Sequence, residues 1–111
     1  FLANPAGQMI DVVSPETKAH CADTVKYGIV DDITKKMKAA YPGKVCDING
    51  ARVQFENGWG LVRASSNMPE LVLIFEADTM EHLLEIRSIF KTYTREYEEI
   101  SDNWKNDVVE A

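Results

Sequence analysis

The sequence predicts an α+β domain of two layers, in which two helices lie on one face of a four-stranded, largely antiparallel sheet. Two long stretches carry apolar residues every three or four positions, which is the spacing of an amphipathic helix. Shorter stretches alternate apolar and polar residues, as half-buried strands do. Two Asn-Gly pairs favour the tight turns that join neighbouring antiparallel strands. The elements follow in the order β-α-β-β-β-α, which favours a sheet with both helices on one side.

The first strand and the first helix come from the N-terminal third of the chain. Residues 1–13 show no clean periodicity, so we expect a linker from a preceding domain, with a short extended piece at Met9–Val13. Residues 17–21 alternate in polarity and predict a half-buried strand. From Asp23 to Tyr41 apolar residues recur every four positions, and the carboxylate of Asp23 can cap the start of this helix. Pro42 and Gly43 end it.

A three-stranded meander follows the first helix. Its strands are predicted at Val45–Ile48, Ala51–Phe55 and Trp59–Arg63, and the pairs Asn49-Gly50 and Asn57-Gly58 supply the turns between them. Asn-Gly favours these turns because both residues tolerate the positive φ angles that a tight hairpin needs. We therefore expect an antiparallel arrangement in this part of the sheet.

The last strand and the second helix complete the predicted domain at residues 14–100. Glu70–Ala77 carries apolar residues on both faces, so we expect it to be covered on both sides. Asp78 and Glu81 have the spacing of a capping box, and the helix that they open carries an apolar stripe as far as Ile100. Residues 101–111 are polar and are expected to form a frayed tail.

Composition and charge exclude several classes of protein. The 111 residues carry a net charge of −6, whereas nucleic-acid-binding proteins are usually basic. No apolar run approaches the roughly 20 residues of a membrane span. We therefore expect neither nucleic acid nor a membrane as a partner, and any anion site must be local. The chain begins at Phe1 without the pattern of a signal peptide, which favours a cut piece of a longer protein or a processed product. We expect a cytoplasmic location.

The two cysteines and two histidines do not form a recognisable reactive site. Cys21 and Cys46 lack the spacing of a zinc site, and we expect two free, buried thiols, with one disulfide as the alternative. His20 and His82 have no metal-ligand spacing and are expected to be solvated. The acidic runs are interpreted as solvated helix faces: Asp31, Asp32, Glu96, Glu98 and Glu99. No catalytic residue and no metal ligand is therefore predicted.

One polar stretch points to anion binding. Arg63 stands at the end of a predicted strand, and Ser65, Ser66 and Asn67 follow it. The planar guanidinium of arginine can bind a phosphate or carboxylate with two parallel hydrogen bonds. Hydroxyl, amide and backbone N–H groups in a concave loop add further donors to an anion. The alternative is an ordinary polar loop in which the arginine pairs with a local carboxylate such as Glu70.

The surrounding sequence resembles the C-terminal domain of the α-D-phosphohexomutases, most closely the bacterial phosphomannomutase/phosphoglucomutases. Residues 48–90, INGARVQFENGWGLVRASSNMPELVLIFEADTMEHLLEIRSIF, are similar to that family's G-W-G-L-V-R-A-S-N-T-x-P region and its F-E-A strand. Residues 14–30, SPETKAHCADTVKYGIV, resemble its T-P-E-I strand and the following helix. Arg63 and Ser65 match the family's R-x-S-N-T loop, whereas Ser66 stands where Asn is usual and Asn67 where Thr is usual.

This resemblance implies a particular fold and role. It implies a TATA-box-binding-protein-like fold for this domain and a loop, here Arg63, Ser65, Ser66 and Asn67, that binds the phosphate of a hexose phosphate. It also implies a four-domain enzyme that interconverts hexose 1-phosphates and 6-phosphates, an isomerase with intramolecular phosphotransferase chemistry. A phosphoserine in the first domain, Mg²⁺ in the second, a sugar-recognition loop in the third and a hexose 1,6-bisphosphate activator belong to that full-length enzyme.

The sequence is consistent with two hypotheses for the function. In the first, the chain is the phosphate-binding domain of such a mutase, acts with the other domains of the same polypeptide and is inactive alone. In the second, it is a stand-alone, non-catalytic module of the same fold that binds an anion or a protein. The choice among mannose, glucose and N-acetylated sugars would lie in another domain, so the sequence does not predict it.

Overall fold

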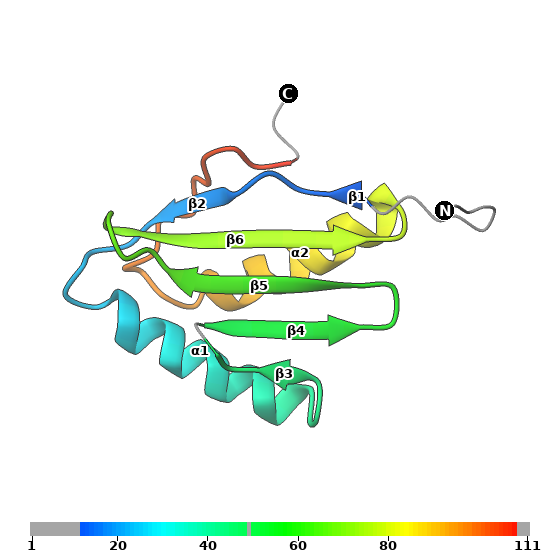
Figure 1. The fold of residues 1–111 in the computed structure, drawn as a ribbon. Helices are drawn as coiled ribbons and strands as arrows, with labels where there is room; N and C mark the ends of the chain where they lie inside the picture. The colour runs from blue at the N-terminus through cyan, green and yellow to red at the C-terminus, as the bar shows by residue number, and fades with distance from the viewer. Residues whose placement is uncertain (1–11, 49, 109–111) are drawn as a thin grey trace.

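Six strands form one antiparallel sheet with two helices packed against it (Figure 1). The computed structural model describes residues 12–48 and 50–108. Strands β1 and β2 both pair with β6, which is followed across the sheet by β5, β4 and β3. The strands are β1 Val12–Val13, β2 Thr17–His20, β3 Val45–Cys46, β4 Ala51–Phe55, β5 Gly58–Ala64 and β6 Glu70–Ala77, and the helices are α1 Lys26–Ala40 and α2 Met80–Thr94.

The predicted α+β class and antiparallel pairing are confirmed, but the number of strands is larger than expected. Every extended stretch predicted between residues 17 and 77 forms a strand, and β1 adds another at the edge. The observed order is therefore β-β-α-β-β-β-β-α, with six strands instead of four. The two shortest strands, β1 and β3, have two residues each and lie within the extended pieces expected at Met9–Val13 and Val45–Ile48.

One face of the sheet carries the core. Alternate residues of the strands point to the helices, so that Val53, Val62 and Phe75 are fully buried in the core cluster that the sheet forms with the helices. A Cβ atom at Gly60 would lie 2.4 Å from the ring of Phe90, which shows how closely α2 approaches β5. The helices contribute the other large buried side chains of this cluster: Ile33, Met37, Leu83, Ile86 and Phe90.

The helices begin one to three residues after the predicted caps, and α2 ends at Thr94, six residues before the predicted end of its apolar stripe at Ile100. Helix α2 is capped by Thr79, whose hydroxyl accepts the backbone N–H of His82 at 3.1 Å. The side chain of Asp78 instead bonds the ring of His82 at 2.5 Å, so this histidine is only partly solvated. Helix α1 begins at Lys26 after a turn, and Asp23 does not cap it.

The predicted frayed tail is wrong for its described part, residues 101–108. Lys105 and Lys18 exchange two backbone hydrogen bonds of 2.7 and 2.9 Å along the free edge of β2. Trp104 is only 2% exposed and stacks on Phe75 at 6.2 Å between ring centroids. A single buried indole among polar residues gives no periodic signal, which is why the sequence pattern predicts fraying instead.

The N-terminal segment and the two cysteines agree only in part with the predictions. Residues 1–11 of the predicted linker lie outside the described residues, and Val12–Val13 pairs with β6 as β1. Cys21 and Cys46 are both free, as predicted, but only Cys21 is buried, and burial raises the pKa of its thiol. No helix in the described ranges is long and apolar enough to cross a membrane.

Candidate anion-binding site

The four predicted site residues lie where β5 leaves the sheet. Arg63 is near the end of β5 and Ser65, Ser66 and Asn67 form the turn that leads to β6. The Ser65 N–H donates to the carbonyl of Glu70 at 2.9 Å, which closes the base of this turn. The structure therefore brings the guanidinium and the three small polar side chains to the same corner of the sheet.

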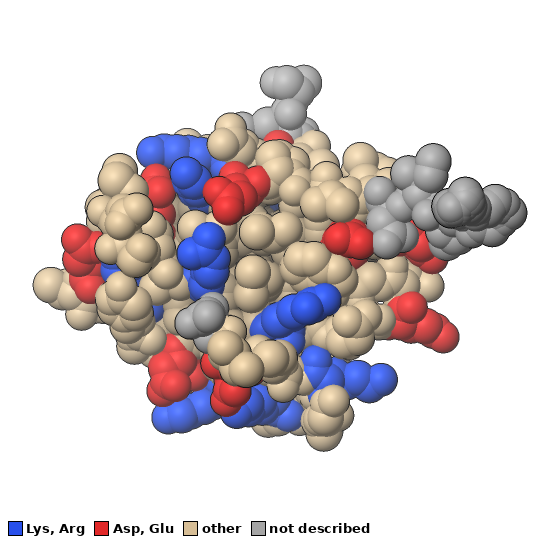
Figure 2. Space-filling model, in the orientation of Figure 1, with Lys and Arg blue, Asp and Glu red and all other residues tan. Residues whose placement is uncertain are grey.

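Arg63 is held on the sheet face that the helices leave open. Arg63 and Lys18 both pair with Val72 of β6, from opposite sides, so their side chains project to one face. Figure 2 views this face and shows Lys and Arg side chains spread across its middle, although the chain as a whole carries a net charge of −6. Arg63 and Lys18 are therefore two cations of this open face.

Arg63 lies beside a carboxylate, as the alternative of an ordinary polar loop expects, but this carboxylate is Glu16 and not Glu70. Arg63 Nη2 lies 3.7 Å from Glu16 Oε2, and the two side chains are 38% and 54% exposed. Glu70 is buried and its carboxylate lies 3.7 Å from Lys105 of the C-terminal segment. A long ion pair between exposed groups contributes little stability. The guanidinium of Arg63 can therefore exchange this contact for a better anion at small cost.

The hydroxyl of Ser65 organises the turn. Its Oγ accepts the backbone N–H of Asn67 at 3.3 Å and that of Met68 at 3.2 Å. A hydroxyl has two acceptor positions and one proton, so these two bonds leave the O–H of Ser65 as a donor. Ser66 Oγ donates to Asn67 Oδ1 at 3.4 Å, which leaves the amide NH₂ of Asn67 to donate elsewhere. The turn therefore offers several donors beside one cation.

Two hydrogen bonds attach the turn to the segment before α1. The backbone N–H of Cys21 donates to the carbonyl of Pro69 at 2.8 Å. The ammonium of Lys26 donates to the carbonyl of Met68 at 2.9 Å. The turn is consequently tied to the body of the domain at its C-terminal side as well as at its base.

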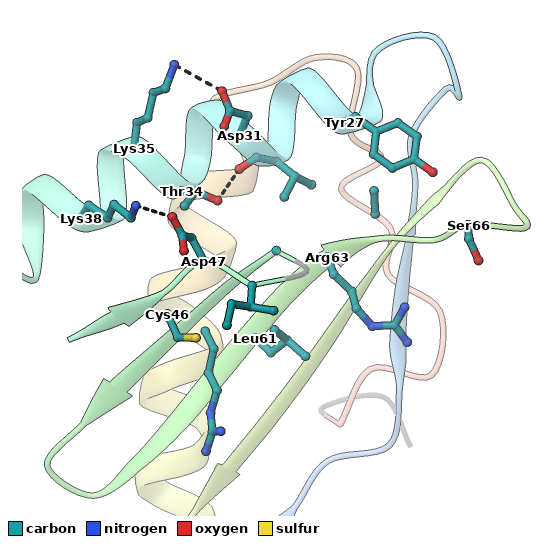
Figure 3. Close-up of a pocket in the computed structure, with 15 residues that line it drawn as sticks. Tyr27, Asp31, Thr34, Lys35, Lys38, Cys46, Asp47, Leu61, Arg63 and Ser66 are labelled. Carbon is teal, nitrogen blue, oxygen red and sulfur yellow. Dashed lines mark hydrogen bonds and ion pairs between the residues drawn. The ribbon is translucent and has the colours of Figure 1, made fainter. Parts of the chain in front are cut away.

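A hollow of about 1000 Å³ lies beside this corner, between α1, the β3–β4 loop and β5. Figure 3 shows Arg63 and Ser66 at one end of it and Lys38 and Asp47 at the other. Gly50 closes its floor with a φ of +116°, and a Cβ there would lie 2.8 Å from Cβ of Arg63. The glycine thus allows the loop to lie directly against the strand that carries Arg63.

Sequence reasoning missed the hollow, Glu16 and Lys26. Only the strand register places Glu16 beside Arg63, and only the packing of α1 places Lys26 beside the turn. The sequence signal for the close approach of Gly50 to Arg63 is the glycine of the Asn49-Gly50 pair, which by itself predicts only a turn. Its partner Asn49 lies outside the described residues.

The described residues offer no metal-ligand cluster. No group of three or more His, Cys, Asp and Glu side chains in residues 12–48 and 50–108 is placed to hold a metal ion. The hydrogen bond from the His82 ring to the Asp78 carboxylate raises the pKa of His82, but this pair lies at the start of α2, and not in the turn after β5. The groups that the turn after β5 presents are N–H and O–H donors beside one guanidinium.

Comparison with known proteins identifies the class of domain. The family model described as phosphoglucomutase/phosphomannomutase, C-terminal domain, matches residues 16–92, which include the whole corner described above. The chain therefore belongs to the phosphoglucomutase/phosphomannomutase family and corresponds to its C-terminal domain.

Individual relatives agree with this assignment. The phosphomannomutase/phosphoglucomutase of Pseudomonas aeruginosa is 37% identical over 81 residues, which are 73% of this chain and 17% of that protein. The phosphoglucomutase of Neisseria meningitidis is 41% identical over 63 residues, 57% of this chain and 14% of that protein. A crystal structure of a phosphoglucomutase/phosphomannomutase family protein from Burkholderia thailandensis has a TM-score of 0.62 and 30% identity, over 82% of this chain and 19% of that one. The chain thus spans less than a fifth of these relatives.

Proposed function

We propose that this chain is the phosphate-binding C-terminal domain of a cytoplasmic phosphohexomutase, and that Arg63, Ser65, Ser66 and Asn67 bind the phosphate of a hexose phosphate. The observation that carries the proposal is the position of Arg63. Its exposed guanidinium lies at a strand end, beside a turn rich in donors, within the residues that match the family's C-terminal domain. A guanidinium and several O–H and N–H donors are the groups that a phosphate dianion prefers.

The two departures from the family loop preserve this chemistry. Ser66 and Asn67 stand where Asn and Thr are usual, and each still carries a donor. Ser66 is already bonded to Asn67, so the two side chains form one unit rather than two independent contacts. We infer that the site recognises the same phosphate with a slightly different arrangement of donors.

In this role the domain contributes binding energy and not a nucleophile. It holds the phosphate that does not react, and this remote contact orients the reacting end of the sugar in the other domains. Closure of the domain over the substrate excludes water from the reactive phosphoenzyme that the family resemblance implies. The chain alone is expected to lack mutase activity, because the phosphoserine and Mg²⁺ of that mechanism belong to other domains.

Substitution of Arg63 in the whole protein tests the proposal. Loss of a hydrogen bond to a charged group costs about 1.5–3 kcal/mol, so Arg63→Ala should lower kcat/KM roughly 10- to 150-fold. Arg95→Ala is the matched control, because it removes an exposed arginine from the segment after α2, outside the turn. Unchanged kinetics of Arg63→Ala would contradict the proposal. A whole protein without mutase activity would favour the non-catalytic module.

A further inference from the structure

Lys26 is buried in a place where a lysine is unfavourable. Its side chain is 3% exposed, and it is the first residue of α1. Lysines are almost never fully buried unless they are paired. The N-terminus of a helix carries positive partial charge, which disfavours a cation there. Because both burial and the helix dipole act against it, the contacts of this ammonium group require an explanation.

The contacts of Lys26 lead to the turn after β5. Its Nζ donates to the carbonyl of Met68 at 2.9 Å and lies 2.7 Å from Asp23 Oδ1. Met68 is far from Lys26 in the sequence, whereas Asp23 is a local and largely exposed partner. The same Met68 carbonyl accepts the N–H of Glu70 at 2.7 Å. Lys26 thus completes the hydrogen bonding of the Met68 carbonyl.

Met68 is also connected to the candidate site through its own N–H. The N–H of Met68 donates to Ser65 Oγ, so one residue receives Lys26 on its carbonyl and is held by Ser65 through its amide. Displacement of Met68 would therefore change the direction in which the Ser65 hydroxyl points. It would also free the Asn67 segment, which shares the same acceptor.

We propose that Lys26 is a positioning residue for the anion site: by holding the carbonyl of Met68 it fixes the turn in the shape that presents Ser65, Ser66 and Asn67 beside Arg63. This inference rests on the proposed phosphate-binding function of that turn. A turn fixed in this way favours an anion at the corner where Arg63 lies.

The test compares three variants of the 111-residue chain, which closes its own core around the sheet and both helices. Lys26→Met keeps the length and apolar stem but removes the donor and the charge. Lys26→Arg keeps both. Lys36→Met removes one charge from an exposed position of the same helix, outside the turn. Backbone amide shifts at residues 63–68 report the binding of inorganic phosphate, and hydrogen exchange at Asn67, Met68 and Glu70 reports the order of the turn.

We expect Lys26→Met to weaken phosphate binding about 3- to 10-fold, the size of one ordinary hydrogen bond. The same variant should speed exchange of the three amides at an unchanged melting temperature. Lys26→Arg should recover most of the affinity, and Lys36→Met should behave as the parent chain. Equal phosphate affinity of the parent and Lys26→Met would overturn the inference alone. Absence of phosphate binding to the parent chain would overturn the proposed function and the inference with it.

Discussion

Removal of the Glu16 carboxylate should strengthen anion binding. Glu16 lies 3.7 Å from the guanidinium of Arg63, and both side chains are more than a third exposed. An exposed ion pair of this kind contributes about 0.2–1 kcal/mol. A phosphate at Arg63 must give up that interaction, since the carboxylate either leaves or repels the incoming dianion. Glu16→Gln keeps the shape of the side chain and removes the charge.

The expected gain follows from this energy. About 0.2–1 kcal/mol corresponds to a dissociation constant roughly 1.4- to 5-fold lower, because 1.4 kcal/mol is tenfold. The assay is a titration of the chain with inorganic phosphate at low salt, followed by the amide shifts of residues 63–68. The difference between Glu16→Gln and the parent chain should shrink as salt is added, because exposed charges are screened.

A second variant separates the local effect from the change in net charge. Glu98→Gln alters the net charge of −6 by the same unit, at an exposed residue after α2. It should leave phosphate affinity nearly unchanged. An equal gain in both variants would show that only the overall charge matters. A loss of affinity in Glu16→Gln would refute the reasoning, because Glu16 would then support the site instead of competing for Arg63.

Three further predictions concern the fold. Gly60→Ala should lower the free energy of unfolding by about 1–3 kcal/mol in denaturant titrations, because its Cβ would meet the ring of Phe90 at 2.4 Å. Trp104→Ala should lower it by about 3–5 kcal/mol, whereas a frayed tail would give no change. Asp78 raises the pKa of His82 above 6.5, so the stabilisation by this pair is complete below about pH 6.5 and is lost as pH rises through the raised value. Asp78→Asn should lower the pKa of His82 in an NMR titration and flatten that part of the stability profile.

Strand and helix positions follow from the sequence where the pattern is long. The eight residues of β6 and the apolar stripe of α1 each repeat several times, so their type and approximate bounds are predictable. The β4–β5 turn shows the limit of local rules. The pairing of Phe55 with Gly58 places the turn at Glu56 and Asn57, one residue before the predicted Asn-Gly pair. Gly58 lies inside β5, where a Cβ would meet the backbone of Glu76 at 2.0 Å.

The candidate site shows which part of a site is local in sequence and which part is not. The cation and the three small polar residues lie within five positions of the sequence, so their possible role as anion donors can be predicted from the sequence alone: Arg63, Ser65, Ser66 and Asn67. The groups that modulate them come from other elements: Glu16 from the segment before β2, and Lys26 from the start of α1. Their proximity depends on strand register and helix packing, which no local pattern encodes. For this reason the alternative to anion binding names Glu70 as the partner of Arg63, whereas the structure places Glu16 there.

The most direct test of the central claim is a titration of the 111-residue chain with glucose 1-phosphate and with mannose 1-phosphate, followed by backbone amide shifts. If Arg63 and the following turn bind the phosphate alone, the largest shifts should fall at residues 63–68 and be of similar size for both sugars. The dissociation constant should be about 1 mM or weaker, near −4 kcal/mol, because the other domains supply the remaining contacts. Arg63→Ala should abolish these shifts. Shifts that centre instead on residues 31–38 of α1, or that persist in Arg63→Ala, would contradict the assignment of this corner as the phosphate site.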